Sequence, residues 1–345
     1  MKFAVVGAGV IGETHARLIT SLPEGSELVA VVDVEADRAI ALSDKYGGEP
    51  MTDLKQACAR PDIDAVSICL PSGYHADAAI TALEAGKHVI VEKPIDVTLA
   101  AADRLIDAEQ QTGLTVAVIS QRRFQHAPAF MHQAVADGRL GRITTGIAES
   151  AFWRSQEYYD SGGWRGTVAL DGGGALMNQG IHVVDLLLWM LGDPVEVQAY
   201  SDRLAHDRIE VEDTVAATVR FRSGAIGSIV ATTSAYPGRP VRLSVYGDRG
   251  SAVIENDDLI VFDAADAEST AETQSVADGQ PAGGASVTQS VADAHRDQYL
   301  DFIEAVRDGR PPSIGTRDAR RALEVVLGIY ESARTGAPVH LTGRD

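Results

Sequence analysis

The sequence predicts an α/β protein in which an N-terminal, doubly wound parallel sheet is followed by an α+β domain with an open, mostly antiparallel sheet. Three observations support this fold class. Short β-branched runs alternate with helical runs in the first third, a glycine-rich turn follows the first run, and strand-like runs separated by turns dominate from about residue 195. At 345 residues, 45% of them hydrophobic, the chain can form two cores, and we expect domains at 1–121 and 122–345.

The first third has the pattern of a parallel sheet whose two faces are covered. Its apolar runs are rich in valine and isoleucine and lack polar alternation, as strands do when helices pack on both sides. The expected strands are KFAVVGAG, ELVAVVD, AVSICLP, HVIVEK and LTVAVIS, and the expected helices cover residues 13–22, 38–46 and 76–85.

The remainder predicts helices first and then a sheet with one exposed face. Val215, Ala217 and Val219 alternate with Thr214, Ala216 and Thr218, which is typical of an antiparallel strand packed on one side. The expected strands are VEVQAY, TVAATVRF, AIGSIVATT, VRLSVYG, SAVIE and LIVF, with helices at 127–137, 175–191, 293–308 and 316–335. Residues 263–292 are poor in hydrophobic side chains and read as a solvated insertion, with a partner-binding arm as the less favoured alternative.

Composition excludes several classes of partner. The formal net charge of -19 would repel nucleic acid and anionic membrane surfaces. Two cysteines are too few for a disulfide scaffold, the N-terminus lacks the apolar core of a secretion signal, and no apolar run approaches the ~20 residues of a membrane span. We therefore expect an acidic cytoplasmic protein.

The turn GAGVIG predicts dinucleotide binding. Gly7, Gly9 and Gly12 have the G-x-G-x-x-G spacing between a strand and a helix, where they permit a tight turn, close approach of a pyrophosphate and helix–strand packing. Asp33 ends the second strand, about where a carboxylate binds the adenosine ribose. An acid there repels the 2′-phosphate of NADP, so we expect NAD, while nearby Arg38 keeps NADP as an alternative.

Two further loops leave the carboxyl ends of predicted strands, where ligands bind in such sheets. In residues 70–75, LPSGYH, Pro71 and Ser72 could line the nicotinamide ribose. In EKP, Lys93 lies between a strand end and Pro94, so its backbone is kept out of helical geometry and its ammonium group can project toward the cofactor. Position alone leaves an ordinary surface lysine equally open.

The segment GGGALMNQGIHVVDLLLWMLG carries polar residues at the start of an apolar helix. Asn178 and His182 are four residues apart and would share one face, one turn from each other. The apolar stripe consists of Ile181, Val184, Leu188 and Leu191. The residues by themselves favour a core histidine, with Asn178 and Asp185 bracing the helix.

With GAGVIG, EKP, QRRF, YYDSGGWRGT and DGGGALMNQGIHVVDLL in this order, the chain resembles the glucose-fructose oxidoreductase/inositol dehydrogenase family, Gfo/Idh/MocA, over nearly its whole length. The resemblance implies a Rossmann domain, a C-terminal sheet used for homodimer or homotetramer contacts, and NAD(P)-dependent oxidation or reduction at a carbinol carbon. It implies that Lys93 and His182 are the catalytic residues. With this resemblance, a catalytic role for His182 becomes favoured over the role of a core histidine.

The resemblance further assigns binding roles. Many members have aspartate where this chain has Asn178, and an amide cannot act as a base. We expect substrate contacts from Asn178, Arg123, Arg154 and Tyr158, although a surface ion-pair role remains equally open for Arg154 and Arg165. We expect cofactor contacts from Gly7, Gly9, Val10, Ile11, Gly12, Asp33, Leu70, Pro71, Ser72, His75, Glu92, Lys93, Gln121, Trp164 and Arg165.

Three functional hypotheses follow. The first is NAD-dependent oxidation of a ring secondary hydroxyl of a sugar, sugar derivative or cyclitol, with His182 as the base and Lys93 polarising the oxygen. The second, a UDP-sugar (uronate) 3-dehydrogenase, is suggested by the Asn-Gln-Gly-Ile-His version of the helix. The third, from another class, is an inactive NAD(H)-binding regulatory protein. We expect no metal, because His182 with Asp185 lacks a third ligand and His126 with His132 is too loosely spaced.

Overall fold

The structure, a computed structural model, describes residues 1–23, 25–256, 258–265 and 291–343. The chain forms two compact units: unit 1 comprises Met1–Ser120 and His295–Leu323, and unit 2 comprises Gln121–Ala294 and Glu324–Asp345. Of the insertion expected at 263–292, residues 266–290 lie outside the described residues. No helix in the described ranges has both the length and the apolar character needed to cross a membrane.

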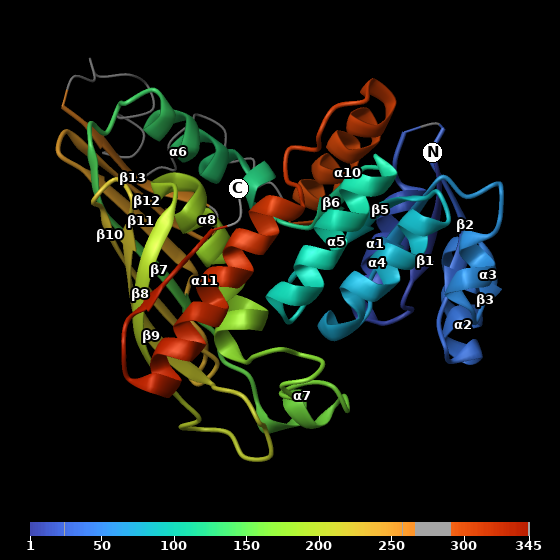
Figure 1. Cartoon of the computed structure of the whole chain (residues 1–345), viewed down its shortest axis with the longest axis horizontal. Helices are drawn as coiled ribbons and strands as arrows, with labels where there is room; N and C mark the ends of the chain where they lie inside the picture. The colour runs from blue at the N-terminus through green and yellow to red at the C-terminus, as the bar shows by residue number, and fades with distance from the viewer. Residues whose placement is uncertain (24, 257, 266–290, 344–345) are drawn as a thin grey trace. The chain divides into compact units, whose positions relative to one another are not determined.

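Unit 1 is a doubly wound α/β unit. Its six strands are parallel and have the order β3-β2-β1-β4-β5-β6, flanked by helices (Figure 1). The elements are β1 (Lys2–Val6), α1 (Val10–Thr20), β2 (Glu27–Val32), α2 (Ala36–Tyr46), β3 (Glu49–Met51), α3 (Leu54–Cys58), β4 (Ala65–Ile68), η1 (Ser72–Tyr74), α4 (His75–Glu84), β5 (His88–Val91), α5 (Leu99–Thr112) and β6 (Val116–Val118). The fold class predicted for the N-terminal part is confirmed.

Helix α5 was not among the expected elements, although its end signals are present. The Oγ1 atom of Thr98 accepts a hydrogen bond from the Ala101 N–H at 3.2 Å, which caps the start of the helix. Gly113, with φ of +67°, ends the helix in the left-handed conformation that favours glycine. These two signals define the helix better than its weak apolar stripe does.

The C-terminal segment His295–Leu323 belongs to unit 1. Tyr299 and Phe302, both fully buried, pack against Phe3 of β1 with ring centroids 5.7 and 6.4 Å apart. Gln298 accepts a hydrogen bond from the Ser120 N–H and donates one to the Val118 carbonyl, so it completes the edge of β6. Unit 1 is therefore built from two distant parts of the chain, whereas the expected division at residue 121 used only the first.

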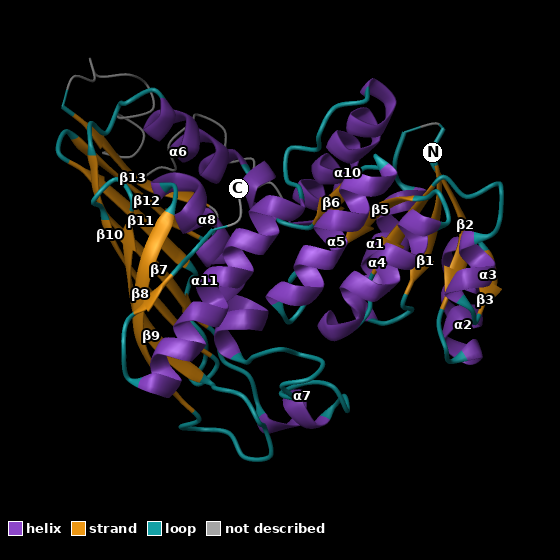
Figure 2. Cartoon of the chain, in the orientation of Figure 1, coloured by secondary structure: helices purple, strands orange, loops and turns teal. Residues whose placement is uncertain are grey.

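Unit 2 contains a mixed sheet (Figure 2). Its described strands have the order β13-β12-β11-β7-β10-β9-β8-β14, and among their pairings only β7–β10 is parallel. The predicted open, mostly antiparallel sheet is confirmed. The elements are η2 (Gln121–Phe124), α6 (His126–Ala136), β7 (Ile143–Ala151), α7 (Gln156–Asp160), η3 (Ala175–Gly180), α8 (Ile181–Leu191), β8 (Pro194–Asp202), β9 (Thr214–Phe221), β10 (Ile226–Thr232), β11 (Arg242–Gly247), β12 (Gly250–Glu255), β13 (Asp258–Ala264) and β14 (Val339–His340). Helices α10 (Val291–Asp308) and α11 (Thr316–Thr335) each contain residues of both units.

One face of this sheet is covered and the other is open. Helix α8 packs on β7 and β11, and α6 packs on β12 and β13. Gly146 of β7 permits the close approach of α8, because a Cβ atom there would lie 2.6 Å from a methyl group of Leu187. On the opposite face, Tyr200, Ala216 and Val230 form an exposed row across β8, β9 and β10.

Candidate active site

The glycine turn between β1 and α1 has the geometry of a dinucleotide site. Gly7 has φ of +99°, and a Cβ atom on it would lie 2.4 Å from the Cys69 carbonyl oxygen. A Cβ on Gly12 would lie 1.8 Å from the Gly7 carbonyl oxygen, so the protein itself requires both glycines. A Cβ on Gly9 would meet nothing within 4 Å. The open space at Gly9 fits a ligand phosphate approaching the backbone at the start of α1.

Asp33 braces this turn from the end of β2. Its Oδ2 atom accepts a hydrogen bond from the Ala8 N–H at 2.8 Å, and its Oδ1 atom accepts one from the Glu35 N–H at 2.9 Å. Each carboxylate oxygen has a second lone pair, so Asp33 can also accept ribose hydroxyls. Beside it in the turn, Val10 is exposed and Ile11 is half-buried at the first positions of α1.

His75 joins the two other expected cofactor loops. Its Nδ1 and Nε2 atoms lie 2.7 and 2.8 Å from the carbonyl oxygens of Pro94 and Leu70, respectively. The ring is buried, and burial lowers the pKa of His75 against the opposing effect of the two carbonyls. The neutral ring has one N–H, so it donates to one of these carbonyl oxygens and packs against the other, between the two loops. Within the first loop, Leu70 and Pro71 are half-buried and Ser72 is buried.

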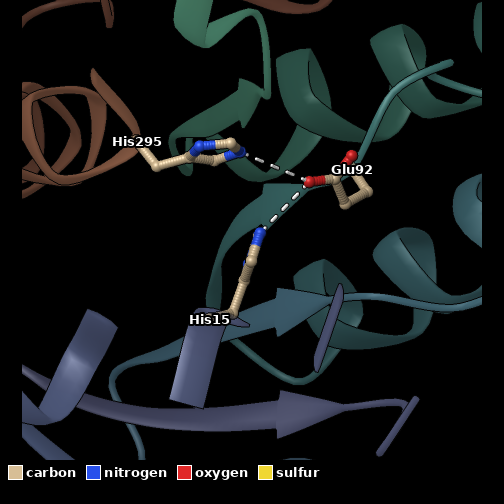
Figure 3. A group of neighbouring side chains, drawn as sticks. All are labelled: His15, Glu92 and His295. Carbon is tan, nitrogen blue, oxygen red and sulfur yellow. Dashed lines mark hydrogen bonds and ion pairs between the residues drawn. The ribbon is translucent and has the colours of Figure 1, made fainter. Parts of the chain in front are cut away.

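Glu92 supports Lys93 from within the core of unit 1. Its Oε2 atom accepts the Lys93 N–H at 3.1 Å, and its Oε1 atom lies 3.1 Å from His15 Nε2 and 4.0 Å from His295 Nε2 (Figure 3). Burial would raise the pKa of Glu92, but the hydrogen bond and charge of His15, together with the charge of Lys93, hold it well below its usual range. Lys93 itself is half-buried, and its peptide bond to Pro94 is cis.

In unit 2, the start of the glycine-rich helix is fixed by a buried carboxylate. Glu212 Oε2 accepts the Gly174 N–H, and Oε1 accepts the Leu176 N–H, both at 2.8 Å. The Glu212 carbonyl oxygen accepts the Ala175 N–H at 3.1 Å, and a Cβ on Gly174 would lie 1.6 Å from that same oxygen. Only glycine permits this approach, which explains the last glycine of the GGG run.

The expected regular α-helix over 175–191 is wrong in its first part. Residues Ala175–Gly180 form the π-helical turn η3, and the α-helix α8 begins at Ile181. Glu212 accepts N–H groups at the start of this turn, which have no partner within the helix. Asn178 therefore belongs to the π-turn, while His182 lies half-buried in the first turn of α8, so the simple one-turn spacing does not apply.

Asn178 is oriented by a second buried carboxylate. Its Nδ2 donates to Asp171 Oδ1 at 2.7 Å, and Asp171 Oδ2 accepts the Gly166 N–H at 2.8 Å. Gln179 Nε2 lies 3.3 Å from Asn178 Oδ1 and 3.4 Å from the Tyr158 hydroxyl. Sequence analysis missed Asp171, although its position directly before the GGG run was a usable signal.

Arg123 has a structural partner within unit 2. Its Nε atom donates to Asp185 Oδ2 at 2.8 Å and a second guanidinium nitrogen donates to Oδ1, giving a two-bonded ion pair. Both side chains are only 6% exposed, and the guanidinium carbon lies 5.3 Å from the ring centroid of Trp189. This ion pair accounts for the burial of Arg123 without a substrate, a role that the sequence analysis did not foresee.

The other expected arginines gather around Tyr158. The guanidinium carbons of Arg154 and Arg165 each lie 4.9 Å from its ring centroid, and Arg165 also lies 5.0 Å from the ring of Trp164. Within the described residues neither guanidinium forms an ion pair, and the buried Nε atoms of both lack a hydrogen-bond partner. Gln121, buried at the start of η2, likewise has no protein partner for its Oε1 atom. These atoms remain available to ligands.

The expected site residues thus form groups within each unit. Unit 1 holds the glycine turn, Asp33, the two loops and Lys93, and unit 2 holds Asn178, His182, the arginines and the aromatic rings. His15, His295 and Tyr299 were not among the expected residues, because only the fold places the two histidines next to Glu92 and Tyr299 next to His15. The sequence analysis also missed Glu212, which follows no recognisable motif.

Comparison with known proteins identifies both parts of the chain. Residues 1–120 match the "Oxidoreductase family, NAD-binding Rossmann fold", and residues 129–253 match the "GFO/IDH/MocA C-terminal domain". These matches cover more than half of the sequence.

Individual relatives span nearly the whole chain. The WlbA dehydrogenase from Bordetella pertussis, solved with NADH and UDP-GlcNAcA, is 30% identical with a TM-score of 0.92, covering 100% of this chain and 98% of that one. Myo-inositol 2-dehydrogenase of Thermotoga maritima is 28% identical over 94% of this chain and 93% of its own length. The 4-carboxy-2-hydroxymuconate-6-semialdehyde dehydrogenase of a Sphingobium strain is 27% identical, covering 91% and 92%.

Replacing Arg123 by Met should destabilise unit 2, because Asp185 would remain buried without its charged partner. We expect the free energy of unfolding to fall by about 3–5 kcal/mol. All three tryptophans, Trp153, Trp164 and Trp189, lie in unit 2, so their fluorescence during urea unfolding reports the change.

The matched control is Arg220→Met, which removes an exposed ion pair with Glu196 and should cost under about 1 kcal/mol. If Arg123→Met has normal stability but binds the substrate more weakly, the structural role is contradicted and Arg123 is a substrate-binding residue instead.

Glu212 should make the stability of unit 2 depend on pH. Burial raises its pKa from 4.5 to about 7, against the hydrogen bonds from Leu176, Gly174 and Tyr330. Between pH 4.5 and 7 the native state binds a proton at Glu212 that the unfolded state has released. The stabilising contribution of Glu212 to the free energy of unfolding is therefore fully present below about pH 4.5 and is lost as the pH rises toward 7. Above that pH the free energy of unfolding no longer changes through Glu212. The contribution is about 3 kcal/mol.

Urea unfolding of the protein and of Glu212→Gln across this pH range isolates the effect, because the variant cannot titrate. The difference in unfolding free energy between the two proteins should be larger at pH 5 than at pH 7.5. A constant difference would show that Glu212 titrates normally.

Proposed function

Because the chain belongs to the GFO/IDH/MocA family of NAD-binding oxidoreductases, we propose that it oxidises a ring secondary hydroxyl of a sugar, sugar derivative or cyclitol to a ketone. The observation that carries this proposal is the retention of both Lys93 and His182 in supported positions. Lys93 follows the anchored Glu92, and His182 begins α8 directly after the anchored π-turn.

His182 acts as the base. Oxidation of a secondary alcohol transfers a hydride from carbon and removes the hydroxyl proton, and histidine accepts protons near neutral pH. The Lys93 ammonium group donates a hydrogen bond to the same oxygen and stabilises its developing negative charge. Asn178, oriented by Asp171, binds a neighbouring hydroxyl. The products are the ketone, the reduced cofactor and one proton.

NAD, when bound, supplies the hydride acceptor. We propose that the glycine turn holds its pyrophosphate and that Asp33 accepts its adenosine ribose hydroxyls. The loops at 70–75 and 92–94, which His75 joins, border the nicotinamide end. Gln121, Trp164 and Arg165 contribute further contacts, which the partnerless Gln121 Oε1 and Arg165 Nε atoms favour.

A UDP-linked sugar acid is the second candidate substrate. The similarity to WlbA supports it, since that protein was solved with UDP-GlcNAcA. So do Arg154 and Arg165, whose guanidinium groups lie beside Tyr158 without an ion pair in the described residues. Guanidinium groups bind carboxylates and phosphates through paired hydrogen bonds, whereas a neutral sugar does not need a guanidinium group for its binding.

An inactive NAD(H)-binding regulator is the candidate from another class. It has no need for a base or for an ammonium group fixed beside a buried carboxylate. The anchoring of Lys93 and of the segment before His182 therefore favours the enzyme.

We propose that the chain forms a homodimer or homotetramer through the open face of its unit 2 sheet. The row of Tyr200, Ala216 and Val230 crosses three strands, and Tyr200 is 80% exposed. An aromatic and apolar row of this kind is typical of a protein interface. We also propose a cytoplasmic location, which the buried, unbridged Cys58 and Cys69 favour and cell fractionation would test.

A substrate panel with NAD and NADP in parallel, followed at the nicotinamide absorbance, tests the activity. We expect NAD reduction by at least one free hexose, inositol, anhydrosugar or UDP-linked sugar acid. Turnover of a free sugar but not of the UDP-sugar acid would eliminate the second candidate. Tight NAD binding without turnover in either direction across the panel would support the regulator instead.

With the best substrate, His182→Ala should lower kcat by about 10²–10⁴-fold and Lys93→Met by about 10²–10³-fold, with NAD affinity retained. The matched controls, His126→Ala and Lys55→Met, change exposed residues and should retain the normal rate. Near-normal turnover in either active-site variant would exclude the role proposed for that residue.

Light scattering tests the assembly. We expect a dimer or tetramer mass, which Tyr200→Glu should reduce because it places a charge in the exposed row. Lys55→Glu in unit 1 should leave the mass unchanged. A monomer mass for the unmodified chain at micromolar concentration would exclude the interface.

A further inference from the structure

A buried ionic cluster in unit 1 lies outside the proposed chemistry. His15 of α1, Glu92 at the end of β5 and His295 of α10 direct their polar atoms toward one another (Figure 3). Their side chains are 0%, 7% and 7% exposed. These residues come from three elements that are far apart in the sequence, so the cluster exists only in the folded unit.

Hydroxyl groups extend the cluster on the far side of His15. Its Nδ1 atom lies 2.9 Å from both Ser67 Oγ and Tyr299 Oη, and these two hydroxyl oxygens lie 2.7 Å from each other. Both ring nitrogens of His15 are therefore engaged, one by Glu92 and the other by the hydroxyls. This arrangement holds the ring in one orientation and directs Nε2 at the carboxylate.

The cluster is costly as a device for stability alone. Burial disfavours charge on His15, but the Cys69 sulfur and Glu92 raise the pKa of His15 to about 10. A buried ion pair of this kind is often no more stabilising than apolar side chains of the same volume. The presence of the cluster is explained if Glu92 has to be both charged and fixed in place.

The fixed carboxylate contacts Lys93 directly. While Oε1 is held by His15, Oε2 accepts the Lys93 N–H at 3.1 Å. The charge of Lys93 in turn favours the ionised form of Glu92. Pro94, the next residue, has no N–H to donate. The hydrogen bond from the Lys93 N–H to Glu92 therefore anchors the backbone of this turn at the lysine.

We propose that His15, His295 and Tyr299 form a positioning network that fixes the catalytic Lys93 through Glu92. The inference rests on the proposed function, because the catalytic role of Lys93 is part of that proposal. It extends that function to the C-terminal segment: α10, some 200 residues after the lysine, contributes His295 and Tyr299 to its support.

Two histidines and a carboxylate are also a ligand set that zinc uses. The distance of 3.1 Å between His15 Nε2 and Glu92 Oε1 is that of a direct hydrogen bond, so the pair satisfies itself within the protein. The network is therefore built on an ion pair, and zinc binding is one outcome of the test.

The first experiment needs no substrate. The chain contains five lysines, Lys2, Lys45, Lys55, Lys87 and Lys93, so 15N-lysine labelling gives five amide signals, and Lys93→Arg assigns the relevant one. We expect His15→Gln, which replaces the imidazole by an uncharged side-chain amide, to speed hydrogen exchange at the Lys93 amide at least about tenfold relative to the other four. Unchanged exchange would overturn the proposal.

The matched control is His88→Gln, at the opposite end of β5. His88 Nδ1 accepts the Thr115 N–H at 3.1 Å, so this variant also removes a histidine hydrogen bond from the same strand. It should leave exchange at Lys93 unchanged. An equal increase in the control would show general loosening of the strand and would overturn the positioning role.

The second experiment measures hydride transfer with the best substrate of the panel. His15→Gln should lower the rate about 10–100-fold with NADH affinity within about threefold of normal. If His15 acts through Glu92, the double variant His15→Gln/Glu92→Gln should be no slower than Glu92→Gln alone, and it removes both members of the His15–Glu92 ion pair together. Additive losses, or a normal rate in His15→Gln, would overturn the inference.

The outcomes separate the two proposals. Near-normal turnover by Lys93→Met would remove the chemical role of the lysine, whereas the exchange measurement reports its positioning independently. Elemental analysis and zinc titration of the purified protein complete the test. One zinc per chain, lost in His15→Gln, would replace the ion-pair network with a metal site.

Discussion

A carboxylate removed from water has to be supplied with hydrogen-bond donors, and this requirement determines the surroundings of the proposed reactive groups in both units. In unit 1, Glu92 receives His15 and the Lys93 N–H. In unit 2, Glu212 receives two N–H groups at the start of η3, and Asp171 receives Asn178. In each case a backbone or side chain next to the proposed reactive groups is held because the buried carboxyl group needs hydrogen-bond partners. The apolar cores supply the packing around these anchors.

The same requirement explains why an amide stands at position 178. Asp171 is 2% exposed and its Oδ1 atom lies 2.7 Å from Asn178 Nδ2, so an aspartate at 178 would place two carboxylates in contact. One of them would then have to take up a proton. The departure from the aspartate common in the family is therefore consistent with the local charge balance, and His182 remains the group suited to accept the substrate proton.

The sequence predicted the parts of the molecule that short-range patterns encode. The strands of unit 1, the Gly7-to-Gly12 turn and the two-sheet division follow from residue type and spacing within a few positions. The anchors were missed because they depend on contacts between distant segments: Asp185 with Arg123 across 62 residues, and Glu212 with Gly174 across 38. The π-turn was also missed, since local periodicity predicts a regular helix and carries no signal for the wider turn.

The return of His295–Leu323 to unit 1 has a consequence for how the protein is made. Tyr299 and Phe302 complete the core around Phe3, and Gln298 completes the edge of β6. During translation β1 is made long before residues 295–323, so this core cannot be completed until that segment has left the ribosome. Residues 121–294 of unit 2 are made between these two parts, so strands β7 to β13 can pair while the sheet of unit 1 still lacks the segment that completes its core.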